Sequence, residues 1–228
     1  MTAPKLTLYT YFRSSAATRV RTVLALHGVP HEQVFVHLLK GEQRTPEYLE
    51  HNPSGAVPAL HVVDDSGEWD LTQSAAIIEY VDEVFGGASP RGSLMPSDAR
   101  GRALVRSIVD ILVCDMQPLA NLKVLTKVKA LAGDEAAVPW ANGWCEAGMK
   151  ALEAILKKTA GKYCYGDSVT LADVAFAPQM NTCIRYVQKE DKDYPTAHGV
   201  FTRLSALPEF VAADWRHQPD TPDEFKAQ

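Results

Sequence analysis

Hydrophobic and polar positions at the start of the chain follow the short periods of a mixed α/β domain. Lys5–Thr10 alternates and predicts a strand, and Ser15–His27 has the period of a helix. Gly28 and Pro30 are typical of a helix end, with glycine as the cap and proline just beyond it. Gln33–His37 alternates weakly and predicts a second strand, so the chain opens with a βαβ unit.

The pattern then predicts a hairpin and a closing helix. A short helix is expected over Glu47–His51. Strands over Ala59–Val63 and Glu68–Leu71 are separated by a short turn, which predicts antiparallel pairing. Thr72–Phe85 is amphipathic, and Thr72 is its expected cap. This segment therefore predicts an α/β domain of βαβ-ββα order with a mixed sheet.

Strand alternation stops after residues 87–96, which have the glycine, serine and proline content of a linker. Helical periods follow over Ser97–Ala132, Ala136–Ala160, Thr170–Tyr186, Phe201–Leu204 and Pro208–Asp214. Pro118 is expected to kink or interrupt the first of these helices. The predicted division is an α/β domain at 1–86, a linker at 87–96 and an all-α helical bundle at 97–228.

Composition narrows the classes of protein that fit this pattern. The chain has 228 residues, of which 46% are hydrophobic, so it can bury a sizeable core. Its net charge of −5 argues against nucleic acid or an anionic membrane as the main partner. No apolar run approaches the roughly 20 residues of a membrane span. The first residues lack the apolar core of a signal peptide, so a cytoplasmic location is expected.

The four cysteines predict reduced thiols in the core of a cytosolic protein. Cys114, Cys145, Cys164 and Cys183 are widely spaced, without a CxxC motif or a ligand pairing with histidine. This spacing argues against a disulfide framework and against a zinc site, so no bound metal is expected.

The joint between the first strand and the first helix is the main candidate for chemistry. Ser14 and Ser15 are good cap residues, and a helix start offers unpaired N–H groups with partial positive charge. Arg13, Arg19 and Arg21 add charge, so the joint suits a thiolate, carboxylate or phosphate. The alternative is an ordinary capped helix with solvated arginines.

Two further places combine turns and polar groups. Gln73 and Ser74 open a helix and form a second start that can receive an anion. Pro58 precedes a strand, where a cis bond would expose the backbone of Val57. The alternatives are a plain cap and a trans turn proline, respectively.

Three features of the helical region have structural interpretations, and two of them also have ligand-binding interpretations. The Thr170-Leu-Ala-Asp173 sequence has capping-box spacing and is interpreted as structural. Gln117 and Asn121, four residues apart, are expected on one helix face, as ligand contacts or as solvated amides. Arg185 ends an apolar helix, where it receives a substrate carboxylate or complements the helix dipole.

Together these motifs resemble the glutathione transferases, and most closely their zeta class, the maleylacetoacetate isomerases. The class signature Ser-Ser-Cys-Ser-x-Arg-Val-Arg resembles Ser14-Ser-Ala-Ala-Thr-Arg-Val-Arg21. The other matching motifs are Tyr9-x-Tyr-Phe-Arg13, Asn52-Pro, Val57-Pro58, Gln73-Ser-x-Ala-Ile-Ile-Glu-Tyr80, Gln117-Pro-Leu-x-Asn-Leu122 and Gln218-Pro-Asp-Thr-Pro222. The first and last motifs are specific to the class, and the match spans essentially the whole chain.

The resemblance implies a thioredoxin-like first domain with Pro58 in cis, glutathione as the cofactor, a homodimer and a role in tyrosine and phenylalanine catabolism. It implies catalytic roles for Ser14 and Ser15 at the thiolate. The implied glutathione contacts are Ser14, Ser15, Ala16, Arg19, Gln43, Val57, Pro58, Gln73, Ser74, Gln117 and Asn121. The implied contacts to a dicarboxylate substrate are Arg13, Arg19 and Arg185.

One departure from the class pattern keeps more than one function open. The signature cysteine falls at Ala16 and the following serine at Ala17. The first expectation is a glutathione-dependent isomerase that converts maleylacetoacetate to fumarylacetoacetate, with transferase side activity on small electrophiles such as α-haloacids. The second is a general conjugating transferase that has lost isomerase activity, and the third is a binding module without catalysis.

Overall fold

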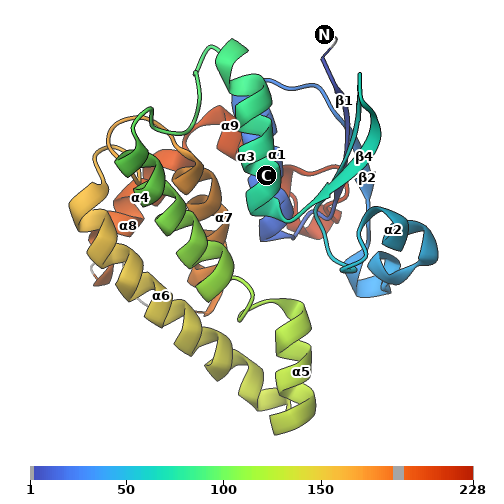
Figure 1. Cartoon of the computed structure of the whole chain (residues 1–228). Helices are drawn as coiled ribbons and strands as arrows, with labels where there is room; N and C mark the ends of the chain where they lie inside the picture. The colour runs from blue at the N-terminus through green and yellow to red at the C-terminus, as the bar shows by residue number, and fades with distance from the viewer. Residues whose placement is uncertain (1–2, 187–192, 228) are drawn as a thin grey trace. The chain divides into compact units, whose positions relative to one another are not determined.

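The computed structural model describes residues 3–186 and 193–227, and the description below concerns these residues. By its internal contacts the chain divides into two units, 1–93 with 208–228 and 94–207 (Figure 1). The sequence assigned 208–228 to the helical domain, whereas its contacts group it with the first unit. Helix α9 (Pro208–Ala213) packs against α1 (Ser15–His27), which explains the difference.

The first unit is built on a four-stranded mixed sheet, as the pattern predicted. Its strands are β1 (Lys5–Thr10), β2 (Glu32–Phe35), β3 (Ala59–Asp64) and β4 (Gly67–Thr72), in the order β2-β1-β3-β4. β1 pairs parallel with β2 and antiparallel with β3, and β3 pairs antiparallel with β4.

The two faces of this sheet have different coverings. Leu6, Leu8, Leu60 and Val62 are at most 3% exposed and share the face beneath α1 and α3 (Ser74–Phe85). Tyr9 lies on the opposite face, where its ring centroid is 5.7 Å from that of Tyr48 in α2 (Pro46–His51). Figure 1 shows α1 and α3 on one side of the sheet and α2 on the other. Because side chains alternate between the two faces of a strand, one face of the sheet carries a buried apolar core and the other a layer of aromatic and polar side chains.

Helix α3 starts later than the sequence predicted. Thr72 is not its cap, because Thr72 pairs with Ala59 and ends β4. The cap is Gln73, whose backbone has φ 70° and ψ 112°. The strand ladder continues to Thr72 and the helix begins at Ser74, so Gln73 alone makes the turn.

The second unit is helical, as the pattern predicted. It contains α4 (Ala99–Asp110), a π-helical segment (Ile111–Met116), α5 (Leu122–Ala132), α6 (Ala137–Thr159), α7 (Leu171–Tyr186) and α8 (Pro195–Ser205). Leu112, Met116, Leu152 and Phe176 are completely buried and form part of its core. In the described part of the chain, no helix has both the length and the apolar character needed to cross a membrane.

The prediction that Gln117 and Asn121 share one helix face is wrong. The backbone N–H of Gln117 donates to the carbonyl of Leu112 over 3.0 Å and closes the π-helical segment. Pro118 has no N–H to continue the helix, and a turn follows. Asn121 is instead the cap of α5, since its side-chain oxygen accepts from Lys123 N at 3.1 Å.

The capping-box interpretation of Thr170 and Asp173 is confirmed. Asp173 Oδ2 accepts from the backbone N–H of Thr170 at 2.8 Å and from its hydroxyl at 2.9 Å. Asp173 Oδ1 accepts from Cys164 N at 2.8 Å, so the carboxylate ties the preceding loop to α7.

The expectation that all four cysteines lie in the core is wrong for Cys114. Its side chain is exposed, while Cys145, Cys164 and Cys183 are buried. The expectation rested on the general preference of free cysteines for the core, which does not decide the position of Cys114 in the π-helical segment.

Candidate functional site

The start of α1 is open to an anion. Ser14 has extended backbone geometry and caps the helix, because its Oγ accepts from Ala17 N at 3.1 Å. The N–H groups of Ser15 and Ala16 come too early in the helix to have a helical carbonyl partner. As a hydroxyl can donate while it accepts, Ser14 keeps a proton for a bound anion. The first turn has no acidic side chain, so nothing on the helix itself repels such a ligand.

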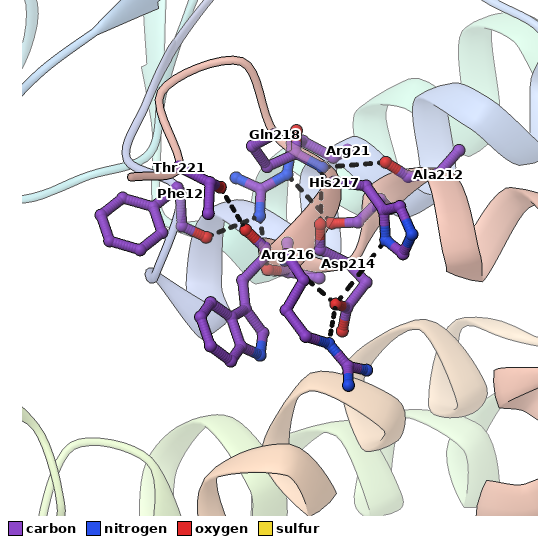
Figure 2. Close-up of polar contacts among 11 residues, drawn as sticks. Phe12, Arg21, Ala212, Asp214, Arg216, His217, Gln218 and Thr221 are labelled. Carbon is purple, nitrogen blue, oxygen red and sulfur yellow. Dashed lines mark hydrogen bonds and ion pairs between the residues drawn. The ribbon is translucent and has the colours of Figure 1, made fainter. Parts of the chain in front are cut away.

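Arg21 holds the strand–helix turn that carries Ser14, and it is not an anion ligand as the sequence suggested. Its side chain is 3% exposed. The guanidinium donates to the Thr10 hydroxyl at 2.8 Å, the Phe12 carbonyl at 3.1 Å and the Ala213 carbonyl at 3.2 Å. Burial lowers the pKa of Arg21 to about 10, so the side chain stays charged at neutral pH. Figure 2 shows this side chain between the turn and the C-terminal segment.

The C-terminal segment reinforces the same turn. Asp220 Oδ2 accepts from the backbone N–H of Phe12 at 2.8 Å. Gln218 Nε2 donates to the carbonyls of Ala212 at 2.8 Å and Asp214 at 2.7 Å, and so fixes the segment after α9 (Figure 2). No role was predicted for the Gln218–Pro222 motif. In the structure it stabilises the strand–helix turn that precedes Ser14. The sequence signal that could have indicated this role is Asp220, which lies between Pro219 and Pro222.

Arg13 is the one exposed arginine of the three predicted at this joint. Its guanidinium carbon lies 5.8 Å from the Trp215 ring centroid and 5.6 Å from the Phe225 ring centroid. These contacts direct the cation along two aromatic faces beside the turn. Arg13 thus offers a positive charge that solvent can reach.

The start of α3 is coupled to α1 through Arg19. The Arg19 side chain is 1% exposed, and its NH1 donates to Ser74 Oγ at 3.1 Å. Ser74 itself is buried, while Gln73 is exposed. A non-glycine residue at positive φ costs of order 1–3 kcal/mol and is concentrated at functional sites. The helix start, the buried cation and the Gln73 backbone together favour a carboxylate here.

The backbone before β3 is held in a fixed shape. The Val57–Pro58 peptide bond is cis, as the resemblance implied. Val57 is buried in a cluster with Tyr11, Phe12, Val36 and Tyr48, and it lies before the paired residues of β3, which begin at Ala59.

Side chains from α2 and its end support this loop. Asn52 Nδ2 donates to the Ala56 carbonyl at 2.6 Å, and the Tyr48 hydroxyl donates to the same oxygen. Burial raises the pKa of Tyr48 to about 12, which keeps its donor proton in place. The loop therefore presents the backbone of Val57 from a rigid support.

Gln43 has an unsatisfied acceptor beside this loop. It lies in the 3-10 helix Glu42–Arg44, and among the described residues its buried Oε1 has no hydrogen-bond partner. Gly55 has φ 58°, and a Cβ there would lie 3.2 Å from the Gln43 carbonyl oxygen. Buried acceptors without donors are rare in folded proteins, so a ligand N–H is the fitting partner.

These pieces fit a small peptide-like ligand that carries a thiol and carboxylates. The start of α1 suits a thiolate, the start of α3 a carboxylate, and Val57 an extended peptide backbone. The first unit supplies Arg13, Ser14, Ser15, Ala16, Arg19, Gln43, Val57, Pro58, Gln73 and Ser74 from the predicted set. The second unit carries the exposed Asn121 and Arg185 and the half-buried Gln117, with Arg185 in the last turn of α7.

Comparison with protein families finds two matching models. Residues 4–83 match the N-terminal domain of glutathione S-transferase, and residues 115–213 match its C-terminal domain.

Individual relatives match over nearly the full chain. Maleylacetoacetate isomerase maiA of Aspergillus fumigatus is 45% identical, covering 99% of this chain and 96% of the relative. A zeta class glutathione S-transferase of Euphorbia esula is 39% identical, covering 96% and 93%.

A solved structure of similar sequence also matches the fold. Maleylacetoacetate isomerase from Anaeromyxobacter dehalogenans with glutathione (GSH) in the active site has a TM-score of 0.86 at 36% identity, covering 97% of this chain and all of that one. A second structure of that protein, at 34% identity with the same TM-score and coverage of 98% and 96%, contains dicarboxyethyl glutathione and citrate in the active site.

Replacing Arg21 tests whether its hydrogen bonds stabilise the turn. Lysine keeps the charge but cannot reach the Thr10, Phe12 and Ala213 oxygens together. We expect Arg21→Lys to lower the free energy of unfolding by about 3 kcal/mol, because buried acceptors lose their donors. Urea denaturation measures this loss.

Arg216→Lys is the matched control, since Arg216 is exposed and pairs with Asp214. Its expected effect is below about 1 kcal/mol, because lysine keeps the positive charge at an exposed position. Equal stabilities of the two variants would contradict the role assigned to Arg21.

Proposed function

Since the chain belongs to the zeta class of the glutathione S-transferase family, we propose that it is a glutathione-dependent isomerase that converts maleylacetoacetate to fumarylacetoacetate. The observation that carries the proposal is the Ser14-capped start of α1, which is open to a thiolate. Conjugation of glutathione to small electrophiles such as α-haloacids is the proposed side activity. The proposed setting is tyrosine and phenylalanine catabolism in the cytoplasm, with the chain acting as a homodimer.

The described residues fit glutathione over its whole length. Gln73 and Ser74 would hold the γ-glutamyl carboxylate, and Arg19 beneath Ser74 adds positive charge. The Val57 backbone would pair with the cysteinyl backbone, with Pro58 shaping the loop. Gln43 would take the glycyl end, which gives its buried acceptor a donor.

Further contacts are proposed from both units. The N–H groups of Ser15 and Ala16 would face the sulfur. Gln117 and Asn121 would approach from the helical unit. Gln117 would bind from the turn before Pro118, and Asn121 would bind from the start of α5, which it caps.

Bound glutathione would supply a thiol that adds to the cis double bond of the substrate and departs after the bond has rotated. The protein's part is to keep that thiol ionised. A free thiol has a pKa of about 8.5, and each unit of lowering corresponds to about 1.4 kcal/mol of preference for the anion. The Ser14 hydroxyl, the Ser15 and Ala16 N–H groups and the helix dipole together can supply about one to two units.

The carboxylates of the substrate need cations that solvent can reach. Arg13 and Arg185 are exposed, and we propose that they bind the two ends of the dicarboxylate. Arg19 is 1% exposed, so its part in substrate binding would be indirect, through Ser74.

Ala16 supports a second candidate function. The position holds cysteine in the class signature, so a step that needs a second thiol cannot take place here. A conjugating transferase would need the ionised glutathione alone. This candidate keeps the same site and differs in the reaction.

Turnover of maleylacetoacetate with and without glutathione separates the two candidates. We expect glutathione-dependent formation of fumarylacetoacetate, with Ala16→Cys changing the rate less than tenfold. Absence of turnover in the wild type, with turnover restored in Ala16→Cys, would favour the conjugating transferase. Failure to bind glutathione in a calorimetric titration would contradict both.

Removing the Ser14 hydroxyl tests its contact with the thiolate. We expect Ser14→Ala to raise the pKa of the bound thiol by about one unit and so to lower kcat/KM about tenfold near pH 6.5. The loss becomes smaller above the new pKa, where the thiol ionises without help. Ser14→Thr keeps a hydroxyl and retains the wild-type pH profile.

Asp98→Ala controls for the loss of a helix cap, because Asp98 Oδ1 caps α4 by accepting from Gly101 N at 2.8 Å. Its pH profile should match that of the wild type. An unchanged profile in Ser14→Ala would remove Ser14 from the proposed mechanism.

Neutralising Arg185 tests the proposed carboxylate contact. We expect Arg185→Gln to raise KM for maleylacetoacetate about tenfold or more, since charge-assisted hydrogen bonds contribute about 1.5–3 kcal/mol. Turnover of a neutral electrophile should not change. Arg100→Gln, which removes an exposed arginine from α4, is the control. Equal KM values in wild type and Arg185→Gln would place the carboxylate elsewhere.

A further inference from the structure

A cluster of two histidines and one aspartate lies on the sheet face that α2 covers. His51 is the last residue of α2, while His61 and Asp70 are cross-strand partners in β3 and β4. One ligand atom from each side chain lies within 4.8 Å of the other two. None of the three is a residue proposed above to bind glutathione or substrate.

The cluster is organised around one carboxylate. Asp70 Oδ1 lies 3.1 Å from Nδ1 of His51 and 3.1 Å from Nδ1 of His61. The side chains are 28%, 23% and 24% exposed for His51, His61 and Asp70, so an ion from solvent can reach them. We propose that His51, His61 and Asp70 bind a divalent transition-metal ion such as Zn²⁺.

The two nitrogen-to-oxygen distances are compatible with a shared metal ion. Two ligand atoms that each lie about 2.1 Å from one ion are about 3.0 Å apart at a right angle and about 3.4 Å apart at the tetrahedral angle. Both nitrogen-to-oxygen distances of 3.1 Å fall in this interval. A bound metal ion would take the place of the protons that Asp70 shares with the two imidazoles.

Oxygen atoms lie near both outer ring nitrogens, one of them at hydrogen-bonding distance. Tyr9 Oη lies 2.7 Å from His51 Nε2, and Glu68 Oε2 lies 3.9 Å from His61 Nε2. A histidine bound through Nδ1 carries its proton on Nε2 and almost always donates it to an oxygen. In the metal-bound form Tyr9 Oη can accept the proton that His51 would carry on Nε2, while Glu68 lies beyond hydrogen-bonding distance and adds negative charge beside His61.

The donor set indicates which ions fit. Two imidazoles and one carboxylate suit Zn²⁺, Co²⁺, Ni²⁺ or Cu²⁺ better than Mg²⁺ or Ca²⁺, which prefer oxygen ligands throughout. Three protein ligands leave at least one coordination position for water. The bound ion would join the end of α2 to the β3–β4 hairpin.

The sequence argument against a zinc site concerned cysteine ligands, and it did not consider a site made of histidine and aspartate. His51, His61 and Asp70 come from three elements, and only the strand register and the position of α2 bring them together. Their spacing along the chain matches no common ligand motif.

Titration of the tag-free, chelator-treated protein with Zn²⁺ tests the proposal. The calorimetric measurement is made without glutathione, whose thiol binds zinc itself. We expect one ion per chain in the wild type. His51→Gln, His61→Gln and Asp70→Asn should each weaken binding by about 10- to 100-fold or more, the loss seen even for outer partners of metal ligands.

Two controls separate this cluster from other zinc ligands. His31→Gln removes a histidine whose Nδ1 contacts the Val29 carbonyl, and Cys114→Ser removes the exposed thiol. Both should bind Zn²⁺ like the wild type. Circular dichroism melting without metal confirms that each variant is folded, and added Zn²⁺ should raise the melting temperature only where the three ligands are intact. No stoichiometric binding, or equal binding in all variants, would overturn the proposal.

Discussion

The candidate site depends on the hydrogen bonds of the buried Arg21 guanidinium. A charge this far from solvent is tolerated only when its N–H groups find acceptors. Arg21 finds them in the strand–helix turn and in the carbonyl of Ala213, so one side chain fixes two distant segments. Asp220 adds a bond to the Phe12 N–H from the same C-terminal segment. Ser14 follows this turn directly, and its position depends on that network.

Helix α1 uses two buried arginines for two different tasks. Arg19 and Arg21 are two residues apart, so their side chains leave opposite sides of the helix. Arg21 holds the backbone that leads to Ser14, whereas Arg19 reaches Ser74 at the start of α3. Both helix starts that can receive an anion are therefore fixed from one helix. A ligand that spans the two starts would meet donors that are already oriented, which reduces the cost of ordering them.

Features set by neighbouring residues could be predicted from the sequence, whereas features set by contacts with other elements could not. The bounds of β1 and α1 were predicted correctly, because strand alternation, Gly28 and Pro30 are local signals. The start of α3 was predicted wrongly, because pairing with β3 extends β4 to Thr72. The faces of Gln117 and Asn121 were also predicted wrongly, because a π-helical segment precedes Pro118. The helix starts at Ser14 and Gln73 and the Val57–Pro58 bond were recognisable from local sequence, whereas Gln43 and the assignment of each residue to glutathione or substrate came from the resemblance. The Asp220 brace and the His51–His61–Asp70 cluster required the three-dimensional structure.

The proposed function depends on the stabilisation of a thiolate at the start of α1. The direct measurement is an ultraviolet titration of the thiol of glutathione bound to the wild-type protein, with S-methylglutathione as the reference for protein absorbance. We expect the bound thiol to titrate with a pKa about one to two units below the free value of about 8.5. A bound thiol that titrates with the pKa of free glutathione would contradict it.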